Sequence, residues 1–415
     1  MRNRWKHMLT ANAVPLLFIG LSALAFLYSG ASGPVVLSDV VSRFTRNAIL
    51  VLSLLYPVLA GMGLNFGIAI GAMAGQTALF FVLLAGLSGA QGLLVAALVS
   101  LPLSVLLGWL SSLVLNRTKG QEMITSMLLA FFASGVYQFF FLYLLGGVIP
   151  VRNPDFLMGS GIGVRSNLDM VGMQYALDDI LKTDLFTCLL GAAAVICIVL
   201  VVWTVKQKGK LVRRLLLAVL DAALLVFGIL GKFFGFLPQY RVMVQIPVVT
   251  LLLIALTGLS IVYFFSTRMG QRMRAVGNDM ASARAVGIDV NRVRTQAMIL
   301  STATAALGQI VYLQNIGTIA VYSAHENVGM FSAAALLVGG ASVSGATVPQ
   351  ALVGTLLFHL LFNILPIAGQ KLFGSPEIGE YFRVFIAYGV IAVTLSLYAW
   401  KAMAQKGVSA GKKRR

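Results

Sequence analysis

Two long stretches without charge are the features that most constrain the fold of this chain. The run from Asn47 to Asn116 contains no Asp, Glu, Lys or Arg, and neither does the run from Asn327 to Gln370. About 20 apolar residues suffice for one transmembrane helix, so each run must hold more than one. Backbone groups facing lipid need partners within their own element, which here favours helices. The sequence therefore predicts an all-α, polytopic integral membrane bundle.

Composition agrees with this interpretation and excludes a soluble enzyme. Of the 415 residues, 59% are hydrophobic and 11% are charged, with a mean hydropathy of +0.91. This is far more apolar than a globular domain of that length requires. We therefore treat residues 1–415 as a single transmembrane domain in a lipid bilayer.

The candidate spans are the charge-poor segments of spanning length, and they indicate about ten to twelve transmembrane helices. Two of them, 47–60 and 327–341, are short, so either is a candidate for a re-entrant segment or part of a broken helix. The segments lie near 12–29, 47–60, 66–88, 92–115, 122–146, 183–204, 213–231, 243–266, 295–317, 327–341, 346–367 and 381–400.

The distribution of basic residues predicts the orientation. With the N-terminus placed inside, three basic residues precede the first span, two lie at 117–119, five at 206–214, six at 267–294 and six after residue 400, which makes 22 of the 31 Lys and Arg. The positive-inside rule then puts both termini in the cytoplasm. The net charge of +18 is thus explained by loops between apolar segments, and no nucleic-acid partner is expected. Most acidic residues fall outside, among them Asp155, Asp169, Asp178, Asp179, Glu377 and Glu380.

The N-terminus permits two interpretations. Basic residues, an apolar core from Ala13 to Leu27 and the small residues that follow also match a cleavable signal peptide within Met1–Gly30. We favour a retained first helix, and cleavage would leave the rest of the topology unchanged.

Motifs for catalysis or metal binding are absent from the sequence. It has no phosphate-binding G-x-x-x-x-G-K-[ST], H-E-x-x-H or C-x-x-C element. His7, His325 and His359 are far apart, and Cys188 and Cys197 share one apolar segment. We expect neither enzymatic activity nor a cofactor or metal in this chain, and a membrane-embedded enzyme ranks last among the alternatives.

The loop at 267–294 contains signals for a short helix lying under the membrane. Residues 279–286 are good helix formers that follow an Asn278-Asp279 cap, and Gly287 is a plausible stop. The basic residues of this loop also suit anionic lipid, which is the simpler alternative to a protein-docking role.

This loop carries a family resemblance. Thr267-Arg-Met-Gly270, Ala275-Val-Gly-Asn278 and Gly287-Ile-Asp-Val290 follow one another as in the permease subunits of bacterial ATP-binding-cassette importers for simple sugars, nucleosides and branched-chain amino acids, which the chain resembles over most of its length. Gly120 to Leu128 resembles the nucleoside-type members most. Two departures stand out: 183–231 looks like an inserted helical hairpin, and Ala69 stands where nucleoside-type members tend to carry Glu.

The resemblance implies a permease subunit in the bacterial cytoplasmic (inner) membrane. It would pass a small polar solute, with a nucleoside favoured and a simple sugar or flavin-like vitamin next. Its implied partners are cytoplasmic subunits that bind ATP and Mg²⁺, a second permease subunit, identical or homologous, and an extracytoplasmic substrate-binding protein or lipoprotein. The residues implied in ATPase coupling are Arg272, Gly277, Asn278, Asp279, Ala281, Ala283, Gly287 and Ile288.

Candidate residues for the translocation path are predicted from their polarity within the spans. Five glycines between Gly61 and Gly75, with Pro57 upstream, are suited to break a helix near mid-membrane, and close helix packing explains them equally well. The candidates are uncharged polar residues suited to a neutral solute or, alternatively, to interhelical hydrogen bonds: Asn65, Gln76, Gln138, Gln309, Gln314, Asn315 and Asn363.

An ion-coupled secondary transporter is the alternative function. Such coupling commonly uses carboxylates within the membrane, and Asp221 is the one acidic residue well inside a predicted span. Because Asp221 lies in the suspected insertion, pairing with a nearby Lys or Arg, or protonation in place, is the better interpretation.

Overall fold

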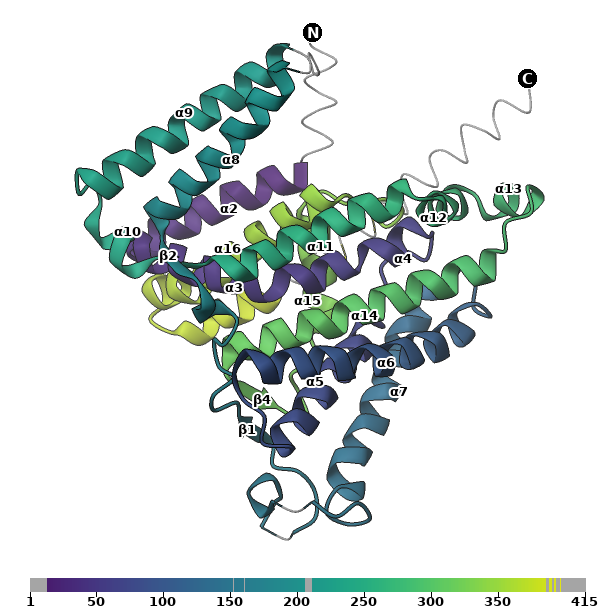
Figure 1. Ribbon diagram of the computed structural model, residues 1–415. Coiled ribbons are helices and arrows are strands. Elements are labelled where there is room, and N and C mark those ends of the chain that lie inside the picture. The colour runs from purple at the N-terminus through teal and green to yellow at the C-terminus, as the bar shows by residue number, and fades with distance from the viewer. Residues whose placement is uncertain are drawn as a thin grey trace.

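The computed structural model is a bundle of long helices, as Figure 1 shows, and confirms an all-α polytopic membrane fold. It describes residues 13–151, 153–159, 161–205, 211–385, 388, 389, 392 and 396. The basic N-terminal residues, the turn at 206–210, most of the predicted last span and the basic tail lie outside the described residues.

Each predicted span up to 346–367 contains helix. Five helices among the described residues are long and apolar enough to cross a membrane by themselves: α6 (Gly89–Leu115), α7 with its π-helical continuation η1 (Glu122–Leu144), α11 (Val248–Ser266), α14 (Val290–Ile316) and α16 (Val348–Phe373). The others are α2 (Ala13–Ser29), α3 (Gly33–Ser53), α4 (Leu55–Leu59), α5 (Ile68–Leu84), α8 (Leu185–Val205), α9 (Leu211–Phe233) and α15 (Val328–Val338). Residues 376–385 are helical, and this helix includes the start of the last span predicted at 381–400.

The short span predicted at 47–60 is wrong in its start. α3 begins at Gly33, and with α4 it forms an element that ends at Leu59. Asp39, Arg43 and Arg46 lie within α3, so a search for charge-free segments missed its first half. The expected break in the 327–341 span is present, because α15 has only 11 residues.

The break between α3 and α4 has a local cause. Pro57 has no N–H to donate to the carbonyl of Ser53, four residues earlier. The Ser301 hydroxyl donates to that carbonyl instead, at 2.9 Å. A side chain of a neighbouring helix thus satisfies the group that proline leaves free, as a low-dielectric environment requires.

Helix α14 is the central element on which α3, α5 and α6 pack through small residues. A Cβ on Gly71 would lie 2.4 Å from the Thr302 carbonyl oxygen, and one on Gly75 would lie 2.3 Å from that of Ala306. These two glycines therefore serve close helix packing, whereas Gly61 (φ +74°) shapes the turn between α4 and α5.

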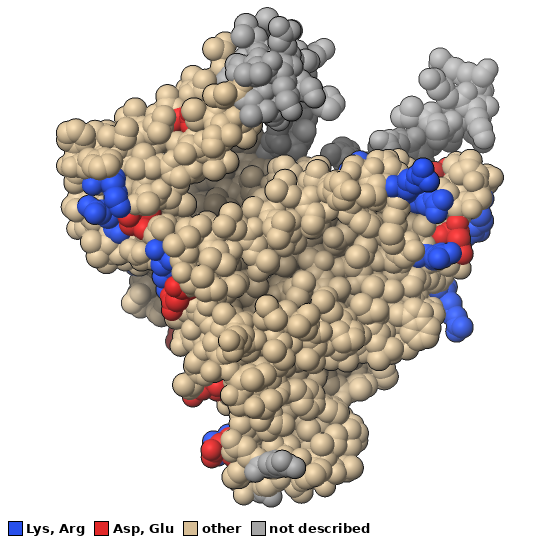
Figure 2. All heavy atoms as spheres, viewed as in Figure 1, with Lys and Arg blue, Asp and Glu red and all other residues tan. Residues whose placement is uncertain are grey.

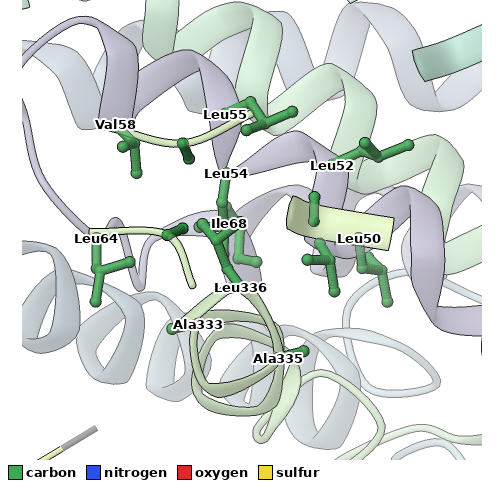
Figure 3. Packing of buried hydrophobic residues seen from close by; sticks show 14 of the residues in the cluster. Leu50, Leu52, Leu54, Leu55, Val58, Leu64, Ile68, Ala333, Ala335 and Leu336 are labelled. Carbon is green, nitrogen blue, oxygen red and sulfur yellow. The ribbon is translucent and has the colours of Figure 1, made fainter. Parts of the chain in front are cut away.

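The largest apolar cluster lies where α3, α4, α5 and α15 meet. Figure 3 shows Leu50, Leu54 and Leu55 close to Ile68 and Leu336. Nearly every residue of α15 is buried. A helix that is apolar all round is expected in such an interior position.

The remaining elements lie at the two ends of the bundle. α12 (Arg268–Asn278) and α13 (Met280–Ala285) join α11 to α14 at one end. At the other end, β1 (Asn167–Asp169) pairs with β4 (Thr318–Ala320) and β2 (Lys182–Asp184) with β3 (Gln245–Pro247), both antiparallel. Nearby are η2 (Pro154–Phe156), η3 (Asp178–Ile180) and α10 (Pro238–Met243).

On the face in Figure 2, charged side chains gather near α12–α13 and near α10, with a broad uncharged surface between them.

The α8–α9 hairpin projects beside the bundle in Figure 1, where the two helices pack mainly on each other. This arrangement suits an insertion, which stays a prediction. Asp221 in α9 is buried, and its Oδ1 has no hydrogen-bond partner among the described residues. Lys232 of the same helix pairs with Asp184 at 3.1 Å instead.

Substituting Gly75 with Ala tests the packing on α14. The added Cβ meets backbone, which cannot move aside cheaply, so we expect the free energy of unfolding in detergent to fall by about 1–3 kcal/mol. Gly135→Ala in α7 is the matched control, because a Cβ there has no atom within 4 Å. Equal stability of the two variants would contradict the packing role.

Candidate functional site

Two helices shorter than the main spans, α5 and α15, begin side by side inside the bundle. A Cβ on Gly329, in the first turn of α15, would lie 2.8 Å from the carbonyl oxygen of Phe66, just before α5. α5 then runs toward the β1–β4 end, where Gly89 donates to the Gly172 carbonyl at 2.6 Å. α15 runs the opposite way, toward a turn whose Val343 approaches Gly63. Two positive helix ends thus face one region inside the bundle.

A cavity of about 320 Å³ opens beside these helix ends. Its volume lies within the roughly 300–1,000 Å³ typical of small-molecule sites. α5 and α7 form one wall, and the turn before α15 forms another. The lining residues are Phe66, Ala69, Met73, Met127, Ala130, Phe131, Ser134, His325, Glu326, Asn327, Gly329, Met330 and Tyr388.

The polar part of the cavity comes from three consecutive residues and one hydroxyl. His325 is fully buried, its Nε2 lies 3.0 Å from Ser134 Oγ, and its ring meets Tyr137 edge-on at 4.8 Å between centroids. Its Nδ1 has no partner among the described residues. Glu326 and Asn327 are exposed in the cavity wall.

The loop at 267–294 forms two helices, so the prediction of one short helix there was incomplete. α13 follows the Asp279 cap as predicted, and Gly287 ends it with φ +82°. α12 was missed, although Thr267 caps its start through the Gly270 N–H. Hydrogen bonds from the Ser282 hydroxyl (2.5 Å) and from backbone N–H groups hold the pKa of Asp279 below its usual value.

Backbone contact fixes α12 against the bundle. A Cβ on Gly277 would lie 2.3 Å from the Leu59 carbonyl oxygen, and one on Gly61 would lie 2.8 Å from the Gly277 Cα. Met273 and Val276 are fully buried beneath the helix. α12 is therefore in direct backbone contact with the α4–α5 turn.

The predicted coupling residues differ in exposure. Five are exposed: Arg272, Asn278, Asp279, Ala281 and Gly287. Gly277 and Ile288 are half-buried, while Ala283 is only 3% exposed and faces the bundle. Val286, which sequence analysis did not select, is 75% exposed at the end of α13.

A buried ion pair ties this loop to the cavity wall. Arg294, in the first turns of α14, is fully buried, and its Nη1 lies 2.8 Å from Glu122 Oε1 at the start of α7. Its Nη2 donates to the Leu115 carbonyl at 2.9 Å. The loop, α6 and α7 thus meet at one guanidinium group, and α7 continues into the cavity wall.

The seven predicted path residues do not line this cavity, and their role stays a prediction. Gln76 donates to the carbonyls of Ala320 and Val321, and Gln309 to that of Ala324, so both hold the segment before α15. Asn65 caps the turn before α5 by accepting from the Gly67 N–H. The Gln314 side chain accepts a hydrogen bond from the Leu177 N–H. The side-chain amides of Asn315 and Asn363 donate to the carboxylates of Asp178 and Asp39, respectively. Gln138 is half-buried in α7.

Comparison with known proteins decides the family. Residues 36–395 match the model of the branched-chain amino acid transport system / permease component family. The chain belongs to this family.

Curated relatives of this permease include a nucleoside ABC transporter permease of Lactococcus lactis subsp. cremoris, which is 31% identical over 34% of this chain and 43% of the relative. A fructose import permease of Bifidobacterium longum is 32% identical over 28% of this chain and 33% of the relative. A guanosine ABC transporter permease of Bacillus subtilis is 28% identical over 38% of this chain and 47% of the relative. Each match thus spans less than half of the relative, and no solved structure matches significantly.

Sequence reasoning missed the polar residues of the cavity in this permease. His325 was considered only as a metal ligand, and Glu326 lies just outside the second charge-free run. The available signal was a Glu and a His directly before a short apolar span, since broken helices expose polar groups at transport sites.

Replacing Arg294 with Met tests the buried ion pair. Glu122 would be left as an unpaired charge, so we expect the free energy of unfolding in detergent to fall by about 3–5 kcal/mol. Arg292→Met, in the same turn but exposed, is the control. Adding Glu122→Leu to Arg294→Met should recover much of the loss, and a double variant no more stable than the single one would argue against the pair.

Proposed function

We propose that this permease is the membrane subunit of an ATP-binding-cassette importer that carries a small polar solute inward. A nucleoside is favoured, followed by a simple sugar or a flavin-like vitamin. ATP and Mg²⁺ bind partner subunits in the cytoplasm. A second permease subunit completes the path, and an extracytoplasmic binding protein or lipoprotein delivers the solute.

The exposed α12–α13 loop is the observation that carries this proposal. It combines the motif shared with the family, a rigid seat on the bundle and an apolar tip at Val286. Val286 and its neighbours Arg284 and Gly287 are all exposed, so this end of the loop is accessible to a protein partner. In this arrangement α12–α13 lies in the cytoplasm with both termini, and the β1–β4 end faces outward.

The geometry also supports a route from ATPase to solute. A push on α12 reaches the α4–α5 turn through Gly277 and Gly61, and it reaches α7 through Arg294 and Glu122. Both the α4–α5 turn and α7 lead to the cavity walls. In this proposal, these contacts carry the movement that opens or closes the cavity.

Val286→Asp tests the attachment. A charge at the apolar tip should reduce co-purification of the ATPase subunits from detergent-solubilised membranes at least tenfold and abolish uptake. The matched control is Val171→Asp, because Val171 is 83% exposed at the opposite end. Undiminished ATPase recovery with Val286→Asp, or equal loss with both variants, would reject the loop as the attachment site.

A further inference from the structure

The wall of the cavity beside α5 and α15 carries an acid that forms no salt bridge with another described residue. Glu326 is exposed there, and none of the salt bridges among the described residues involves it. It directly precedes the N-cap of α15, Asn327, whose side chain caps no backbone N–H. A carboxylate is stabilised near the positive end of a helix. Glu326 therefore offers a carboxyl group to the cavity that no other described residue engages in a salt bridge.

On the basis of the proposed function, we infer that Glu326 and Asn327 bind the vicinal hydroxyl groups of a neutral, ring-containing solute in this cavity. A carboxylate accepts hydrogen bonds from two adjacent hydroxyls, as acidic residues do with ribose in nucleotide-binding folds. The Asn327 amide can both donate to and accept from the same pair. Nucleosides and simple sugars share this diol.

The unpartnered histidine nitrogen is a second, independent sign of a ligand. Ser134 orients the His325 ring through Nε2, and Tyr137 packs against it. Its Nδ1 is buried without a partner among the described residues, which is costly unless a ligand completes it. Because His325 lines the cavity, a solute hydroxyl bound there is the partner that we infer for Nδ1.

The aromatic part of the lining suits the ring of the solute. Phe66, Phe131 and Tyr388 come from three separate segments and present aromatic surface to the cavity. Aromatic side chains stack on nucleobases and pack against the apolar face of sugars. A phosphorylated solute is disfavoured, because its charge would meet Glu326 in a low-dielectric site.

The test compares uptake of guanosine and 2′,3′-dideoxyguanosine by proteoliposomes that hold the complete importer, with fructose as the sugar probe. The wild type should take up guanosine or fructose, which shows whether a nucleoside or a sugar carries the recognised diol. It should take up dideoxyguanosine more slowly than guanosine. Glu326→Gln should lower the guanosine-to-dideoxyguanosine rate ratio about tenfold or more, as expected for a lost hydrogen bond to a charged group. For fructose, both Glu326→Gln and Asn327→Ala should raise KM by a similar factor.

Glu377→Gln is the matched control, because Glu377 is exposed outside the cavity lining. Thermal stability of each complex separates misfolding from altered recognition, and Asn327→Ala provides a second variant. An unchanged ratio and KM in folded Glu326→Gln and Asn327→Ala complexes would overturn the inference, as would a wild type that carries neither guanosine nor fructose. Either result leaves ATPase attachment through Val286 intact, so this inference can fail while the assignment as an importer subunit stands.

Discussion

Close packing against α14 is the interaction on which the rest of this permease depends. Lipid offers no hydrophobic drive for helices to associate, so contact and interhelical hydrogen bonds must hold them. Gly71, Gly75 and Gly108 bring two helices onto α14 at distances that no Cβ would allow. The Thr302 hydroxyl adds a hydrogen bond to the Ser104 carbonyl at 3.0 Å.

A firmly packed central helix lets its neighbours be interrupted. α15, with 11 residues, is too short to span a bilayer, and the chain before both α5 and α15 is irregular. Irregular backbone is tolerated at this depth only where protein or a polar cavity surrounds it. Gln76 and Gln309, both fully buried, supply part of that environment by donating to carbonyls in the segment before α15. The polar cavity and the packed core are thus two consequences of one arrangement.

Local signals predicted local structure well. The Asp279 cap and the Gly287 stop located α13, because both act on the backbone within a few residues. Charge counting failed at α3, where Arg43 and Arg46 lie inside a span and Arg46 Cζ lies 5.8 Å from the Tyr312 ring centroid. A search along the sequence cannot see a partner on another helix, and so it excluded residues that the fold accommodates.

By itself, the sequence determined the all-α membrane class, the approximate position of most spans and the family, because apolar length and local motifs are properties of contiguous residues. Only the tertiary structure decided which polar residues share a site. Glu122 and Arg294 are 172 positions apart, and Ser134 and His325 are 191 apart. Their pairing depends on how the helices cross α14, and that geometry is set by the glycine contacts of the whole bundle. For the same reason a buried Ala283 and an exposed Val286, three residues apart, were distinguished only once α13 was seen against the membrane domain.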